Sequence, residues 1–125
     1  MKTTVSLFNS WLLKPYLAII CIVSVAYLCF MPSVNIPDLT SDKTAHFISF
    51  GTMAFLWMWY FRKAVWVWVS LFFFGYFIEF VQLNLPESFH RGFDHFDALA
   101  DAVGAFIGVL LYFSIQYILK KAALL

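Results

Sequence analysis

The chain has 125 residues, enough for one domain, of which 63% are hydrophobic and only 12% are charged. A soluble domain usually carries about 25% charged residues, so this composition excludes an ordinary soluble fold and favours a protein whose solvent is lipid. The formal net charge of +1 argues against a nucleic-acid partner, because binding to phosphates requires a basic surface.

Four apolar segments follow one another along the chain and predict four transmembrane helices, at about 12–31, 44–61, 64–85 and 98–119. A helix of 18 residues is about 27 Å long, close to the thickness of the hydrocarbon core. Strands are not expected, because the segments show no polar–apolar alternation and lipid does not tolerate open sheet edges. We therefore predict an all-α fold, a four-helix transmembrane bundle with short loops, as a single domain over residues 1–125.

The basic residues indicate how such a bundle is oriented. With the N-terminus in the cytoplasm, the cytoplasmic segments carry six basic residues, which are Lys2, Lys14, Arg62, Lys63, Lys120 and Lys121. The opposite side carries only Lys43 and Arg91. This bias predicts that both termini lie in the cytoplasm. All seven acidic residues and all three histidines then fall in the outer loops or the outer halves of helices, so we expect the protein to act on that side.

The first segment also shares features with a signal peptide. Lys2 and Lys14 form a basic flank, and small residues at 24–26 loosely fit a cleavage site. The apolar run continues through Met31, however, which is longer than the core of a typical signal peptide. We therefore expect this segment to remain in the protein as a helix.

The second segment begins with a group of polar residues. Asp42 and His46 are four residues apart and share one helix face, with Lys43 beside them. Capping of the helix by Asp42 and a headgroup contact of Lys43 would explain these two residues. They would not explain a histidine on an otherwise apolar helix, so His46 is a candidate site residue.

The third segment carries Glu79 and Gln82 near its outer end. A carboxylate about 9 Å below the end of a membrane helix costs on the order of 2–3 kcal/mol, so Glu79 should face the bundle interior with a partner or be protonated. We expect the partner to be Lys43 or Arg91, the basic residues of that side. A structural ion pair that locks the helices together is the alternative to a functional role.

The fourth segment is preceded by three aspartates. If this part is helical, Asp94, Asp97 and Asp101 lie on one face over about two turns. Capping and the helix dipole can account for one or two of them. The third requires a cation, a proton or Arg91 among the carboxylates, which suggests a polar pocket on the outer side.

Gly104 and Gly108 follow the aspartates as a GxxxG motif. Small residues at this spacing allow two helix backbones to approach closely. We expect the fourth helix to pack against the second or third, which would bring Glu79 and Asp101 into one vestibule.

Two kinds of chemistry are open to these residues. His46, His90 and His95 with the carboxylates are ligand types for zinc or manganese, but the sequence contains no compact metal motif, and we expect no metal and no cofactor. No strong nucleophile is evident. Acid–base catalysis by Glu79 or Asp97 stays open, because a buried carboxyl group can hold its proton near neutral pH.

The order and spacing of the polar residues resemble the VanZ-like family over about residues 38–112. The similarity consists of DK-x-x-H from Asp42 to His46, E-x-x-Q from Glu79 to Gln82, and P-x4-R-x2-D-x2-D-x3-D-x2-G-x3-G from Pro86 to Gly108. The resemblance implies a small multi-pass protein of the bacterial inner membrane, in a family named for a member that lowers susceptibility to teicoplanin. It marks eight polar positions without assigning their roles: Asp42, Lys43, His46, Glu79, Gln82, Arg91, Asp94 and Asp97. The family usually has asparagine where this chain has Asp101.

The leading hypothesis is an outward-facing polar pocket that binds the headgroup of a cell-envelope lipid or glycolipid and is linked to glycopeptide susceptibility. The expected partners are membrane lipids and a lipid-linked ligand, and a homo-oligomer is left open. Lys43 and Arg91 would be the cationic contacts, and Asp101 joins the eight polar positions as a ligand-binding candidate. One alternative is a membrane-embedded hydrolase or transferase, with Glu79 or Asp97 as the acid–base residue and a metal held by His46 and an aspartate. Another is a structural or partner-binding helical bundle.

Overall fold

The computed structural model describes residues 6, 10, 14–31, 42–89 and 95–122. Two predicted site residues, Arg91 and Asp94, lie outside this part of the chain, as do His90 and the side chain of Asp42.

The described residues form four α-helices and one short 3-10 helix. They are α2 (Tyr16–Phe30), α3 (Asp42–Phe61), α4 (Ala64–Leu83), η2 (Glu87–Phe89) and α5 (His95–Lys121). No strand occurs in this part of the chain, which confirms the all-α prediction. Each apolar segment has become one helix. Pro15 precedes α2 and Pro86 follows α4, as expected of a residue that lacks a backbone N–H and cannot continue a helix.

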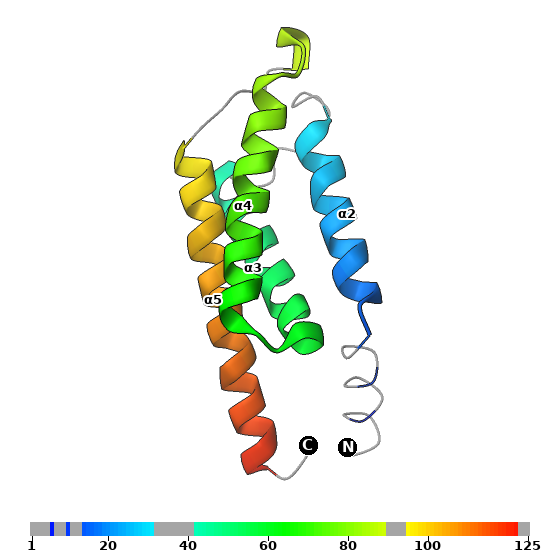
Figure 1. Ribbon diagram of the computed structural model, residues 1–125, viewed down its shortest axis with the longest axis vertical. Helices are drawn as coiled ribbons and strands as arrows, with labels where there is room; N and C mark the ends of the chain where they lie inside the picture. The colour runs from blue at the N-terminus through cyan, green and yellow to red at the C-terminus, as the bar shows by residue number, and fades with distance from the viewer. Residues whose placement is uncertain (1–5, 7–9, 11–13, 32–41, 90–94, 123–125) are drawn as a thin grey trace.

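The helices lie roughly alongside one another, with α5 on one side of the α3–α4 pair and α2 on the other (Figure 1). α5 makes its most extensive contact with α3 and a smaller one with α4, whereas α2 makes fewer contacts, with α3 and α4. Only Arg62 and Lys63 join α3 to α4, so these two helices run in opposite directions. Arg62 has a φ of 59°, the left-handed conformation that often ends a helix before a sharp turn.

Glycines set the distance between α3 and α5. A Cβ atom on Gly104 would collide with the carbonyl oxygen of Phe47, and one on Gly108 would collide with that of Gly51. From the other side, a Cβ on Gly51 would lie 3.2 Å from the Gly104 carbonyl oxygen. The two backbones are therefore in direct contact, which side chains larger than hydrogen would prevent.

The apolar core extends from this contact toward the α3–α4 turn. Phe50, Met53 and Met58 of α3 are fully buried. Trp59 packs edge-on against Tyr112 of α5, with ring centroids 5.2 Å apart and an interplanar angle of 88°, a favourable aromatic geometry. α3 is thus the central helix of the bundle.

The outside of the bundle is also apolar. Large hydrophobic side chains are exposed on all four helices, among them Ile20, Ile48, Trp66 and Phe106. Soluble proteins do not expose apolar surface on this scale. By length and composition, α4 and α5 are the two described helices that could cross a membrane, and α2 is apolar but has only 15 residues. These features indicate a membrane protein.

The glycine contact gives a first prediction. Gly108→Ala should lower the stability of the detergent-solubilised protein by about 1–3 kcal/mol, because the new methyl group forces α5 away from the Gly51 carbonyl. Alanine in an open helix would instead stabilise by about 0.5–1 kcal/mol. Thermal unfolding of this variant, compared with Val103→Ala on the exposed face of α5, distinguishes the two. A raised unfolding temperature for Gly108→Ala would contradict the close contact.

Candidate functional site

Five polar or charged side chains are buried in this otherwise apolar bundle: His46, Glu79, Gln82, Asp97 and Asp101. They come from the first turns of α3, the last turns of α4 and the first turns of α5. These turns meet at the end of the bundle where α4 ends and α5 begins (Figure 1). At about 1.5 Å per residue, His46, Glu79 and Asp101 lie about 6–9 Å from the ends of their helices.

His46 and Asp101 form the closest polar contact at this end. The Nδ1 atom of His46 lies 2.7 Å from Oδ1 of Asp101, and both side chains are almost completely buried. A hydrogen bond at this distance requires a proton on one of the two atoms. The Nε2 atom of His46 lies 4.0 Å from Oδ2 of Asp97. The imidazole therefore lies between two carboxylates on successive turns of α5.

Lys43 connects this group to the surface. Its Nζ atom lies 3.4 Å from Oδ1 of Asp97, and its side chain is 53% exposed whereas that of Asp97 is 7% exposed. Lysine commonly packs its stem on apolar surface and keeps its ammonium group in the aqueous or headgroup layer. The ion pair thus marks the outer rim of the group. We had expected Lys43 or Arg91 to pair with Glu79, and the structure gives Lys43 an acidic neighbour on α5.

Glu79 lies deeper and has no exposed surface. One carboxylate oxygen of Glu79, one ring nitrogen of His46 and one carboxylate oxygen of Asp101 all lie within 4.8 Å of one another. These three residues come from α4, α3 and α5 respectively. The vestibule expected for Glu79 and Asp101 therefore includes His46. We refer to Lys43, His46, Glu79, Asp97 and Asp101 as the polar cluster.

Gly75 is a site residue that the sequence analysis did not identify. A Cβ atom at this position would lie 2.8 Å from Oδ2 and 3.2 Å from Cβ of Asp101. The missing side chain on α4 leaves the space that the Asp101 carboxylate occupies. Gly75 lies one turn before Glu79. This spacing is the only feature of the sequence that connects Gly75 with the site. It becomes informative only once α4 and α5 are known to be in contact.

Gln82 has a different neighbour. Its Nε2 atom donates a hydrogen bond to the carbonyl oxygen of Cys29 at 2.8 Å, near the end of α2. The last turn of a helix has carbonyl groups without partners inside the helix. This bond satisfies one of them and joins α4 to α2. The other histidine of the described residues, His95, is exposed and lies beside Tyr76.

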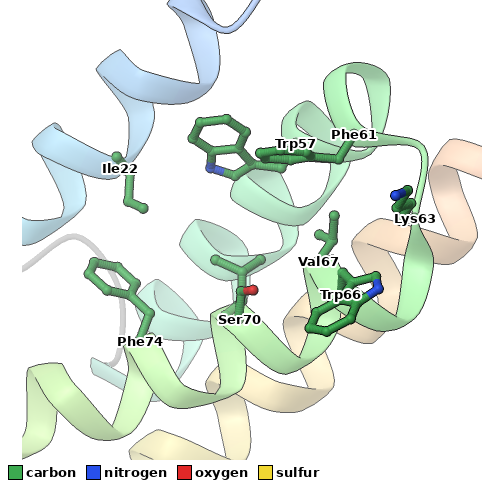
Figure 2. A pocket seen from close by; sticks show the side chains of 9 residues that line it. Ile22, Trp57, Phe61, Lys63, Trp66, Val67, Ser70 and Phe74 are labelled. Atoms are coloured by element: carbon green, nitrogen blue, oxygen red, sulfur yellow. The ribbon is translucent and has the colours of Figure 1, made fainter.

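A large cavity lies at the opposite end of the bundle, near the α3–α4 turn (Figure 2). It has a volume of about 500 Å³ and is lined by Ile22, Trp57, Phe61, Lys63, Trp66, Val67, Ser70, Leu71 and Phe74. Side chains of α2, α3 and α4 face it (Figure 2). Its lining includes no residue of the polar cluster. A cavity of this composition suits hydrocarbon chains and lies apart from the predicted polar site.

The electrostatics of the polar cluster favour a positive partner. Its three carboxylates are opposed by one ammonium group and one imidazole. Carboxylates in a low-dielectric interior are stable only when they are paired, protonated or bound to a cation. Inside the cluster, cations and hydrogen-bond donors are therefore favoured over anions. Lys43, at the rim, is the described residue that could contact an anionic group.

The contact between Gly75 and Asp101 gives a second prediction. Gly75→Ala should destabilise the protein because its methyl group displaces the Asp101 carboxylate from His46. In an Asp101→Ala background the same substitution should be neutral or stabilising, so the two changes should couple by about 0.5–3 kcal/mol. Unfolding of the two single variants and the double variant in detergent measures this coupling. Simple additivity would show that Gly75 does not make room for Asp101.

Comparison with known proteins is consistent with this arrangement. A family model described as VanZ/LLP1 matches residues 6–119, which include the whole polar cluster and all four α-helices except the last two residues of α5. No curated protein and no solved structure matches the chain significantly. The chain therefore belongs to the VanZ/LLP1 family, and this membership together with two apolar helices of spanning length identifies it as a VanZ-like membrane protein.

Proposed function

We propose that this protein crosses the bacterial inner membrane four times, with both termini in the cytoplasm, and that its outer end binds the headgroup of a cell-envelope lipid or glycolipid. The observation that carries the proposal is the polar cluster, which lies at one end of an otherwise apolar bundle and reaches the surface at Lys43. Intramembrane ionisable residues of this kind are usually functional.

The packing of the helices supports four spans. α3 has 20 residues, or about 30 Å, and runs beside α4 and α5 after a two-residue turn. If α4 and α5 lie in the bilayer, α3 occupies the same layer, and its exposed Ile48 and Phe61 then face lipid. α2 is about 22 Å long and packs on α3 and α4, where a modest tilt or local thinning of the bilayer accommodates its shorter apolar length.

The distribution of charge supports the orientation. Arg62 and Lys63 form the α3–α4 turn, and Lys120 and Lys121 are the last two residues of α5. All four lie at the end of the bundle away from the polar cluster. Basic residues near the ends of membrane helices favour the cytoplasmic side. The polar cluster then belongs to the outer leaflet.

This topology gives a third prediction. In a variant that lacks Cys21 and Cys29, a single cysteine introduced by Ser88→Cys should react with a membrane-impermeant maleimide added to intact spheroplasts. A cysteine introduced by Ala122→Cys should react only after lysis. Labelling of Ala122→Cys in intact spheroplasts would contradict the orientation, and labelling of both positions before lysis would show that α5 does not cross the membrane between them.

The charge of the cluster defines how a ligand would bind. Three carboxylates make the buried part unfavourable for an anion, so a phosphate or carboxylate of the headgroup would contact Lys43 and, by the sequence argument, Arg91. Hydroxyl or amino groups of the same headgroup would donate hydrogen bonds toward Asp97, which lies next to Lys43 at the rim. A protein that held a glycosylated cell-envelope lipid in this way would alter its accessibility to glycopeptides, which is the link to antibiotic susceptibility that we propose.

Binding of an anionic lipid gives a fourth prediction. Lys43→Ala should reduce the affinity for phosphatidylglycerol about tenfold or more, the usual effect of losing a charge-assisted hydrogen bond. Arg91→Ala should act in the same direction. Native mass spectrometry of lipid adducts, with phosphatidylcholine as the neutral comparison, measures the change. Lys120→Ala, at the other end of the bundle, is the matched control, and wild-type binding by both Lys43→Ala and Arg91→Ala would refute the headgroup site.

A second candidate function is acid–base catalysis on a lipid-linked substrate. It is favoured by the position of His46, which is held by Asp101 on one side and faces Asp97 on the other. Asp97 is nearer to the rim than Glu79 and is the better-placed acid or base for a substrate entering past Lys43. If the bundle is purely structural, the near-isosteric variants Glu79→Gln and Asp97→Asn should leave lipid binding, antibiotic susceptibility and any hydrolytic activity unchanged.

A further inference from the structure

Three buried side chains at the inner end of the polar cluster have the composition of a metal site. A nitrogen of His46 and one oxygen each of Glu79 and Asp101 lie within 4.8 Å of one another, and all three residues are at most 5% exposed. Imidazole with two carboxylates is a donor set for borderline divalent metals, in particular zinc and manganese. We propose that His46, Glu79 and Asp101 bind one such ion.

Small side-chain movements would bring these atoms to coordination distances. Ligand atoms around a tetrahedral ion at 2.0–2.2 Å lie about 3.3–3.6 Å from one another. His46 Nδ1 and Asp101 Oδ1, which are 2.7 Å apart, would have to separate by about 0.6–0.9 Å when the ion displaces the shared proton. Rotation about the side-chain bonds of Glu79 would bring in the third ligand. Three protein ligands leave a coordination position for water or a substrate oxygen.

The surroundings of His46 are those of a metal-binding histidine. Metal-bound imidazoles usually direct their second nitrogen to a carboxylate, which fixes the ring and its tautomer. With the ion on Nδ1, the proton of His46 lies on Nε2, and Nε2 faces Asp97 Oδ2 at 4.0 Å. Lys43 in turn pairs with Asp97 at 3.4 Å. Lys43, Asp97 and His46 thus lie in series from the rim inward, and a movement of about 1 Å would let Asp97 accept a hydrogen bond from Nε2.

The charge of the described residues agrees with a divalent ion. Among the described residues of the cluster, three carboxylates face one ammonium group and one imidazole, an excess of acidic groups that favours a cation over an anion. Gly75 provides a second, steric observation. Its missing side chain admits the Asp101 carboxylate to the point where it meets His46, and a Cβ atom there would lie 2.8 Å from Oδ2. The rival source of positive charge is Arg91, which lies outside the described residues.

The proposed metal site does not depend on the lipid ligand. If the protein binds metal but not phosphatidylglycerol, the metal site stands and the headgroup function is refuted. If it binds phosphatidylglycerol but no metal, the headgroup function stands and the metal site is refuted. If both hold, the ion would supply a Lewis acid to the enzyme candidate.

The test is metal binding by the full chain, purified in detergent without a polyhistidine tag. Elemental analysis should find about one zinc or manganese ion per chain. Alternatively, protein stripped of metal with a chelator should take up one ion per chain on titration with Zn²⁺ or Mn²⁺. Each of His46→Gln, Glu79→Gln and Asp101→Asn should weaken binding by at least about a hundredfold, and Asp97→Asn by about 10–100-fold, the range for an outer partner of a ligand. Glu87→Gln, a change in an exposed carboxylate, is the matched control and should bind normally.

Two further measurements keep the result interpretable. Wild-type protein loaded with Co²⁺ should show visible absorption bands of a low-symmetry site with nitrogen and oxygen ligands. This measurement uses only the wild-type protein, so it does not depend on the folding of a variant. The bands should vanish in Glu79→Gln if its circular dichroism is that of the wild type. Absence of binding by the wild type, or normal binding by all three ligand variants, overturns the proposal. If Glu87→Gln loses as much metal binding as the three ligand variants do, the ion binds at the surface and the proposal is likewise overturned.

Discussion

The backbone contact between α3 and α5 determines the position of everything else in this molecule. Gly104 and Gly108 bring α5 onto the carbonyl groups of Phe47 and Gly51, so the two helices cannot slide or rotate without a collision. His46 directly precedes Phe47, and Asp101 lies one turn before Gly104. Their 2.7 Å contact is therefore a consequence of how the glycines pack. A conventional helix separation of 8–10 Å with larger side chains would hold these two polar groups apart.

The same contact explains how an apolar bundle tolerates buried carboxylates. Asp97 and Asp101 reach His46 only because α5 is close to α3, and Asp101 reaches the space beside α4 only because residue 75 is glycine. Polar groups in lipid must find their partners inside the protein. The small residues of three helices and the ionisable residues beside them thus form one structural unit, in which loss of the close packing would also separate the polar partners.

The sequence was sufficient to predict the helices but not how they meet. Long apolar runs locate helices because lipid leaves few other structures available, and the predicted starts differ from the observed ones by at most four residues. α3 and α5 begin two and three residues earlier than predicted, so that Lys43 and Asp97 lie within their first turns. Rotation could not be predicted, because helices that are apolar on every face carry no stripe that shows which side is buried.

The site shows the same limit at the level of single residues. His46, Glu79 and Asp101 could be singled out because ionisable groups in apolar segments are costly. The GxxxG motif predicted that Glu79 and Asp101 meet. The direct contact of His46 with Asp101 could not be predicted, because 55 residues separate them and a metal-binding motif is recognised by short spacing. Charge alone predicted Lys43 or Arg91 as the partner of Glu79, whereas the structure pairs Lys43 with Asp97. Gly75 carries no charge and was therefore overlooked, although it controls the space around Asp101.

The separation of 55 residues between His46 and Asp101 has a consequence for biosynthesis. α3 leaves the ribosome well before the aspartates of α5 exist, and at about 5–20 residues per second the delay is about 3–11 s. During that interval a nascent α3 carries an imidazole and an ammonium group with no acidic partner from α5. If α3 crosses the membrane as proposed, its release into open lipid before α5 arrives is unfavourable, and retention at the insertion machinery would protect it until α5 has been translated.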